Sequence, residues 1–227
     1  KYLRLLGAKK IKYIGNLKFS QTEKNEDIIN NSLKKFFSSK KIWCASSTHQ
    51  NEELLCALTH KKLKKKYKNL LTIIIPRHIN RTNSIVNEIK KLGLVVHTHE
   101  SKNKIKKNTD IYLVNSYGKT KSFLKICKTV FLGGSIIRHG GQNPLEAARF
   151  GCKILHGPNV WNFHEIYSLL NKNNVSKKIK NLDQMTLNID KMLKNKVDPQ
   201  TIKIIIKKLG DKILKSTLKE VNFLINK

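Results

Sequence analysis

Short apolar runs alternate with amphipathic stretches along most of this chain. The clearest run, Leu70–Ile75, is apolar except for Thr72 and ends at Pro76, which is the pattern of a buried strand. The stretch Asn83–Leu92 then carries apolar residues at helical spacing and stops at Gly93. The predicted strands are Lys41–Ala45, Leu70–Ile75, Leu94–Val96, Asp110–Asn115, Val130–Leu132 and Lys153–Leu155.

Strands that alternate with helices indicate an α/β fold of the doubly wound class, in which a mainly parallel sheet carries helices on its faces. Thr48 is expected to cap the helix that has Glu52 and Glu53 in its first turn. From Asp183 the pattern is helical to the end, with one helix starting at Asp198-Pro199. A last helix is predicted from an apolar stripe formed by Ile213, Leu214, Leu218, Val221 and Leu224.

A glycine-rich segment follows the fifth of these strands and leads into a short helix. Gly134-Ser135 opens it, and Asn143 is a natural N-cap with Pro144 at the first helical position. Glu146 comes third, where its carboxylate can bond back to the cap. A strand, a glycine-rich turn and a helix N-terminus direct free N–H groups at one point, so this segment predicts an anion site.

Polar clusters also follow several of the predicted strands. In open parallel sheets, ligands bind outside the carboxyl ends of the strands, at the point where the strand order reverses. The clusters therefore predict a nucleotide or sugar-phosphate pocket at that edge. They are Ser46–His49, Pro76–His78, Ser116–Lys119 and Gly134-Ser135.

The charge of the chain favours anionic partners, because its 46 Lys and Arg against 15 Asp and Glu give a net charge of +31. Nucleic acid is one such partner, since phosphate neutralisation dominates that binding. However, the lysines are scattered over helix faces, as at Lys61-Lys62, and no aromatic residues suited to base stacking lie between them. An anionic membrane surface fits this pattern better. A high content of Lys, Asn and Ile, as in proteins from AT-rich genomes, is a third explanation.

The chain length and the cysteine and histidine content limit the number of domains and the cofactors that the chain could hold. A chain of 227 residues can form one large domain or two small ones, and it contains no apolar stretch of the length that spans a membrane. Cys44, Cys56, Cys127 and Cys152 are widely spaced and are expected to be reduced, mostly buried thiols. His97 and His99 lack partners at zinc-ligand spacing, so neither a metal nor another cofactor is predicted.

Several motifs, taken together, resemble one enzyme family. They are Gly15–Phe19, Ser47–His49, Pro76–His78, Gly133–Glu146, Gly157–Asn159 and Asn162-Phe163, and they occur in the family's order over roughly residues 5–167. The chain is similar in these residues to the 3-deoxy-D-manno-octulosonic acid (Kdo) transferases. That family has the GT-B architecture of two Rossmann-like halves, and the resemblance implies that this chain is the C-terminal, donor-binding half.

This resemblance also implies the organisation of the chain. Residues 1–20 correspond to the end of an N-terminal domain and the interdomain linker, and residues 21–182 to the Rossmann-like donor domain. Residues 183–227 correspond to C-terminal helices that pack back on the domain or the cleft. We expect the chain to be a fragment of a longer protein whose N-terminal half is missing here.

Family members transfer Kdo from CMP-Kdo to a lipid A precursor on the cytoplasmic face of the bacterial inner membrane, with inversion and without a metal in the site. The resemblance implies that Lys18 stabilises charge in the transition state and that Ser135 lies close to the phosphate. The CMP-binding residues it implies are Pro76, Arg77, Tyr117, Gly118, Lys119, Ser135, Asn143, Pro144, Leu145 and Glu146.

The chain departs from the family at three points. Tyr117 and Lys119 stand where the family usually has a methionine and an acid, and Gln142 stands where a histidine is usual. The family's general base, a glutamate, belongs to the N-terminal half, so this chain alone is expected to be inactive.

Other interpretations stay open. The chain could be another GT-B enzyme, a UDP-sugar transferase or a nucleotide-sugar epimerase, because the fold is shared among these functions. It could instead be a basic nucleic-acid-binding protein. At the level of single residues, Glu146 could serve only as a capping residue, and Arg77 and Lys18 could be ordinary surface cations.

Overall fold

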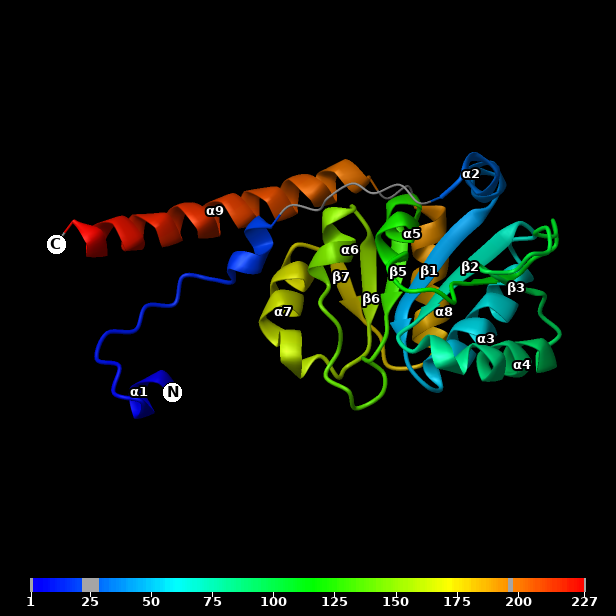
Figure 1. Cartoon of the computed structure of the whole chain (residues 1–227), viewed down its shortest axis with the longest axis horizontal. Helices are drawn as coiled ribbons and strands as arrows, with labels where there is room; N and C mark the ends of the chain where they lie inside the picture. Colours follow the sequence, from blue (N-terminus) through cyan, green and yellow to red (C-terminus); the bar gives the residue numbers. More distant parts are fainter. Residues whose placement is uncertain (1, 22–28, 196–197, 227) are drawn as a thin grey trace.

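The computed structural model describes residues 2–21, 29–195 and 198–226. Within these ranges the chain forms one seven-stranded sheet in the order β3-β4-β2-β1-β5-β6-β7, and every pair of neighbouring strands is parallel (Figure 1). This confirms the predicted doubly wound α/β class. The strands are β1 (Lys41–Thr48), β2 (Leu70–Pro76), β3 (Val96–Thr98), β4 (Ile111–Leu113), β5 (Thr129–Leu132), β6 (Lys153–His156) and β7 (Ser176–Lys178).

Helices cover both faces of the sheet. One face packs on α2 (Asn31–Ser38), α5 (Thr120–Ile126), α6 (Leu145–Arg149), α7 (His164–Lys172) and the start of α9 (Pro199–Ile225). The other face packs on α3 (Glu52–Lys64), α4 (Thr82–Lys91) and α8 (Leu182–Lys194). The remaining short elements are α1 (Tyr2–Leu5) and the 3-10 turns η1 (Leu17–Ser20), η2 (Ile79–Arg81) and η3 (Trp161–Phe163).

The two helical layers explain why the central strands are apolar almost throughout. In β2, Leu71 and Ile73 belong to the core on one face, whereas Leu70 and Ile74 belong to the core on the other. Successive side chains of a strand point to opposite faces, so a strand covered on both sides must be apolar at nearly every position. The four cysteines are buried in these cores as free thiols, as expected.

The strand order places a switch point between β1 and β5. These two strands are neighbours, but β2, β4 and β3 lie on the β1 side of the sheet, and β6 and β7 lie on the β5 side. The loops that leave β1 and β5 therefore diverge, which opens a crevice at the carboxyl edge of the sheet.

Several predicted boundaries are wrong, including those at the end of β1 and the start of β3. Thr48 does not cap a helix: it is the last residue of β1 and pairs with Pro76, while α3 begins four residues later at Glu52. The third strand begins at Val96, not Leu94, because it is the short edge strand that pairs with β4 from Val96 onward. The edge strand β7 was not predicted, since its sequence Ser176–Lys178 is polar.

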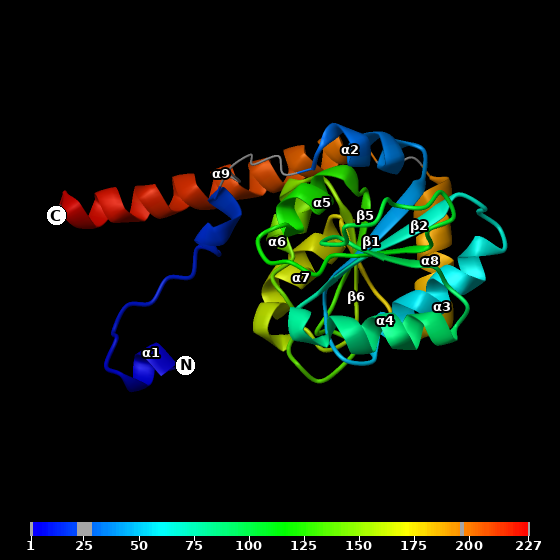
Figure 2. The same cartoon turned by 45° about the vertical axis from the view of Figure 1, so that its right-hand side comes forward.

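The chain also ends in one helix where two were predicted. Helix α9 runs without a break from Pro199 to Ile225, with Asp198 as its N-cap (Figure 1). Its first half packs on the domain through Ile202 and Ile206, which are buried. Its second half projects beyond the sheet, and the N-terminal segment lies on the same side of the molecule in both views (Figures 1 and 2).

The predicted apolar stripe lies on this projecting half. Ile213 packs against the core, but Leu214, Leu218, Val221 and Leu224 are exposed. A glycine inside α9 allows the helix to meet the N-terminal segment closely, because a Cβ on Gly210 would lie 2.5 Å from the carbonyl oxygen of Phe19.

We therefore expect Gly210→Ala to lower the thermal stability of the protein. Alanine improves helix propensity by about 1 kcal/mol, but overpacking typically costs about 1–3 kcal/mol, and here the obstacle is backbone. Thermal unfolding of the variant measures the balance, with Ser216→Ala on the exposed side of α9 as the control. A Gly210→Ala protein at least as stable as the parent would show that η1 does not pack tightly on α9.

Candidate functional site

A buried carboxylate joins the two loops of the switch point. Glu52, in the first turn of α3, is 1% exposed, and its side chain accepts four backbone hydrogen bonds. The N–H groups of His49 and Gly134 donate to Oε2 at 3.0 and 2.7 Å. Those of Ser135 and Ile136 donate to Oε1 at 3.1 and 3.0 Å. The loop after β1 and the loop after β5 are thus tied to the same side chain.

This arrangement occupies backbone N–H groups of the glycine-rich loop that could otherwise bind a ligand. The N–H groups of Gly134 and Ser135, which were expected to face an external anion, donate to Glu52 instead. Gly133 must be glycine, because a Cβ there would lie 2.7 Å from Oε2 of Glu52 and 2.6 Å from Cα of Thr48. Two loops at this edge are therefore fixed by an anion that the protein itself supplies.

Ser135 has a structural task in the same loop. Its side chain is buried, and its hydroxyl donates to the carbonyl of Leu132 at 2.5 Å and accepts from the N–H of Gly157 at 2.8 Å. The hydroxyl thus links the loop after β5 to the end of β6. The predicted phosphate contact of Ser135 stays a prediction, and these bonds place its hydroxyl below the loop surface.

A polar cavity of about 380 Å³ lies beside the same loops. Its walls come from the end of β1, from the segment that leads into α6 and from α5, and they include Ser47, Asn143 and Glu146. Asn143 lies before α6, and its side chain accepts a hydrogen bond from the N–H of Leu145 at 3.1 Å, as a cap would. However, α6 begins at Leu145, so Pro144 is its N-cap and not its first helical residue as predicted. Pro144 and Leu145 are buried and anchor this helix in the core.

In this cavity Glu146 faces a lysine that was not predicted as a site residue. Its carboxylate lies 3.9 Å from the ammonium group of Lys121 on α5, and both side chains are partly exposed. Tyr117, Gly118 and Lys119 lie just before α5, so their loop leads directly to this ion pair. Tyr117 is exposed, and none of these three residues is among those that line the cavity in the described part of the chain.

Pro76, Arg77 and Lys18 are not among the residues that line the cavity in the described part of the chain. Pro76 ends β2, and Arg77 follows it with an exposed side chain and a backbone N–H that donates to the carbonyl of Thr48 at 2.9 Å. Lys18 is exposed on η1, and its carbonyl accepts a hydrogen bond from the guanidinium of Arg149, which lines the cavity. The structure thus places Arg77 at the carboxyl end of β2 and Asn143 and Glu146 in the cavity wall, whereas Lys18 lies on η1 beside α9.

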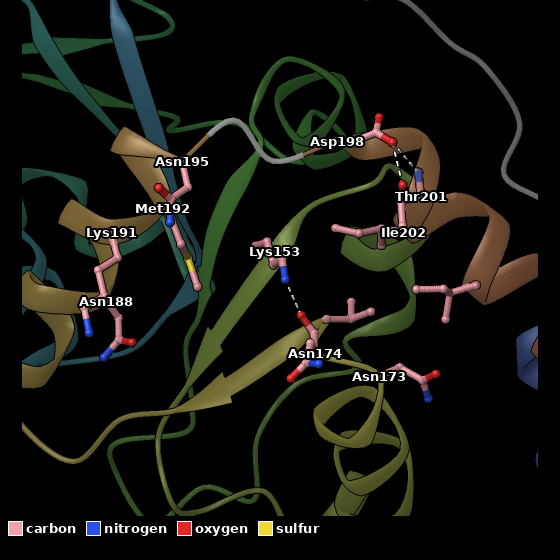
Figure 3. Close-up of a pocket in the computed structure, with 12 residues that line it drawn as sticks. Lys153, Asn173, Asn174, Asn188, Lys191, Met192, Asn195, Asp198, Thr201 and Ile202 are labelled. Atoms are coloured by element: carbon pink, nitrogen blue, oxygen red, sulfur yellow. Dashed lines mark hydrogen bonds between the residues drawn. The ribbon is translucent and has the colours of Figure 1, made fainter.

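A larger cavity, of about 460 Å³, lies at the opposite end of the sheet (Figure 3). It is lined by Lys153 at the start of β6 and by residues of α8 and the start of α9. Several of its polar groups are already used: Lys153 donates to the carbonyl of Asn174, and Asp198 accepts from Thr201 (Figure 3). Because parallel sheets bind ligands at their carboxyl ends, we assign the candidate site to the smaller cavity.

Sequence comparison with known proteins relates this chain to one group of enzymes. The 3-deoxy-D-manno-octulosonic acid transferase of Haemophilus influenzae is 32% identical over 164 residues, which are 71% of this chain and 38% of the relative. The transferase of the same name from Rickettsia typhi is 32% identical over 196 residues, which are 84% of this chain and 41% of the relative. This chain is a relative of the Kdo transferases.

A solved structure agrees with this relationship. The C-terminal CMP-Kdo binding domain of WaaA from Acinetobacter baumannii matches with a TM-score of 0.68 and 22% identity, over 80% of this chain and 93% of that domain. The fold is that of GT-B glycosyltransferase C-terminal domains, as the resemblance implied. No family model matches the chain. The chain spans about two fifths of the length of the curated Kdo transferases cited above.

Among the described residues, no helix combines the length and the apolar character needed to cross a membrane. The same part of the chain contains no group of three or more His, Cys, Asp or Glu side chains arranged to hold a metal ion.

We expect Glu52→Gln to destabilise the protein by about 2–4 kcal/mol. Hydrogen bonds to a charged group are worth about 1.5–3 kcal/mol. In addition, the amide group of glutamine would turn its own N–H donors toward two of the four backbone N–H groups. Chemical denaturation measures this change. Glu88→Gln, which alters an exposed acid on α4, is the control and should stay within about 0.5 kcal/mol of the parent.

A second variant separates the role of the carboxylate from general loss of packing. Glu52→Ala removes the carboxylate and leaves space beside the four N–H groups, so added formate or acetate should raise its melting temperature more than that of the parent. If these anions stabilise both proteins equally, the four N–H groups do not form an anion site when Glu52 is absent.

Proposed function

We propose that this chain is the donor-binding part of a Kdo transferase, which transfers Kdo from CMP-Kdo to a lipid A precursor. The relationship to Kdo transferases over most of the chain supports this proposal. The observation that carries it is the polar cavity at the switch point, whose wall contains Asn143 and Glu146 from the motif that carries the resemblance.

The chemistry of the site suits a nucleotide donor. A carboxylate such as Glu146 can accept hydrogen bonds from a ribose diol, and its partial exposure leaves it accessible. Arg77 presents a planar set of N–H donors that matches a phosphate or a carboxylate. The backbone of Lys18 is held next to the cavity by the bond from Arg149 to its carbonyl, and its side chain is exposed. We assign its ammonium group the role of stabilising negative charge on the departing nucleotide.

The acceptor and the cellular location belong to the same proposal. A lipid A precursor resides in a membrane, and the net charge of +31 favours an anionic surface, because each lysine near such a surface contributes about 1 kcal/mol to binding. We propose that the protein acts at the cytoplasmic face of the bacterial inner membrane. Proton removal from the acceptor is assigned to a glutamate of the other half of the enzyme.

This proposal predicts selective nucleotide binding. The chain should bind CMP, weakly, and should prefer CMP to UMP and UDP, because the proposed pocket recognises a cytosine and a single phosphate. Isothermal titration with the three nucleotides measures the preference. A preference for UDP would favour a UDP-sugar enzyme, and salt-sensitive binding of DNA or RNA without affinity for cytidine nucleotides would favour a nucleic-acid-binding protein.

The same preparation tests the assignment of the general base to the other half. Incubated with CMP-Kdo and a lipid A precursor, the chain alone should form no product. Turnover by the chain alone would show that the base lies among its own residues.

Arg77→Ala should impair donor binding far more than folding. The side chain is exposed at the carboxyl end of β2, so its loss should change stability by only about 0.5 kcal/mol. Loss of one charge-assisted bond to an anion should weaken CMP binding by about ten- to a hundredfold. Arg77→Lys should also be impaired, because lysine cannot reproduce the planar donors.

Titration of CMP into the parent and both variants measures these effects, with thermal unfolding as the check on folding. Unchanged affinity in Arg77→Ala would remove Arg77 from the site.

A further inference from the structure

Three histidines and an arginine gather where β1, β2 and β5 end. The ring of His49 lies 4.2 Å from that of His139 and 5.7 Å from that of His78, measured between ring centroids. The three rings come from three different loops, and Arg77 is the residue before His78. We refer to His49, His78, His139 and Arg77 as the histidine cluster.

The innermost ring of this cluster has an unused polar atom. His49 is 8% exposed, and its Nε2 is buried without a hydrogen-bond partner. Burial, together with the smaller effect of the neighbouring His139, His78, Arg77 and Arg81, lowers the pKa of His49 to about 4. A buried polar atom without a partner is uncommon in a folded protein and calls for an explanation.

The two carboxylates near the cluster in the described part of the chain are engaged by other groups. Glu52 is nearby, but its carboxylate is taken by four backbone N–H groups. Glu53 is held by Arg81, whose two terminal nitrogens donate to its oxygens at 2.9 and 3.2 Å. Arg77 forms no ion pair with any residue in the described part of the chain.

The cluster adjoins the candidate nucleotide cavity. A Cβ placed on Gly134 would lie 3.1 Å from His139, 3.3 Å from His49 and 3.3 Å from the amide nitrogen of Gln142. Gln142 also lines the cavity beside Asn143 and Glu146. A ligand in this cavity can therefore place an anionic group next to the histidines.

We propose that the histidine cluster binds an anionic oxygen group of the donor, either its phosphate or a sugar carboxylate. The proposal rests on the donor being a nucleotide-linked acidic sugar. His78, His139 and Arg77 are exposed and form the rim of the site, and His139 lies over His49. An anion at this rim, with a small shift of His139, gives Nε2 of His49 the acceptor that it lacks.

The imidazole signals of the chain test this proposal by NMR. Inorganic phosphate should shift the ring resonances of His49 and His139, while those of His164, an exposed histidine at the start of α7, should not move. If the cluster takes the phosphate of the donor, CMP should produce the same shifts and cytidine should not. If it takes the carboxylate, free Kdo should shift these rings and CMP should leave them unchanged.

Two variants measure the contribution to affinity. His49→Phe keeps an aromatic ring and removes its N–H donor, and His139→Ala alters an exposed side chain, whose loss should barely change stability. Each should weaken binding of whichever probe shifts the rings by about tenfold, as the loss of one charge-assisted hydrogen bond does. His164→Ala should bind that probe as the parent does.

The proposal is overturned if phosphate, CMP and Kdo all leave the rings of His49 and His139 unmoved, or if both variants bind like the parent. This result is separate from the test of the function. UMP carries the same phosphate as CMP, so a protein that fails to prefer cytosine would still shift these rings if the cluster binds phosphate.

Discussion

The carboxylate of Glu52 fixes the geometry on which the candidate site depends. The sheet alone cannot position the two loops of the switch point, because the chain leaves β1 and β5 toward opposite edges. Glu52 supplies the missing connection by accepting N–H groups from both loops while it remains in the first turn of α3. The positive end of that helix also favours the negative charge. The position of α3 on the sheet thus sets the shape of the loops that surround the cavity.

The same interaction determines how this protein can recognise an anion. Glycine-rich loops after a strand commonly bind phosphate through their backbone N–H groups. Here those groups are satisfied internally, and a second anion beside Glu52 would meet like charge. Recognition must therefore come from side chains at the rim. Arg77 and the histidines occupy that position, and Lys121 provides a further cation next to Glu146.

The parts of the structure that were predictable from the sequence are those set by local patterns. The strand at Leu70–Ile75 could be predicted because burial on both faces demands an apolar sequence. The edge strand β7 could not be predicted, because its sequence is polar. Motif order placed Arg77, Asn143 and Glu146 near one end of the sheet. Glu52 looked like an ordinary first-turn acid, because its partners in the loop after β5 lie 82 to 84 residues further along the chain.

The charge of the chain has a structural explanation as well as a functional one. Several of its few acids are engaged inside the fold: Glu52 and Glu53 hold the loops, and Asp110 accepts from His60, Lys64 and the N–H of Val95. Hydrogen bonds from these partners keep the pKa of Asp110 low, near 2, against the opposing effect of burial. Because Glu52 and Glu53 are used inside the fold, they do not pair with surface lysines, and the excess positive charge lies on the outside. A protein of this kind attracts anionic ligands and surfaces from every direction, and selectivity must then come from the few positions, such as the histidine cluster, where cations converge on one point.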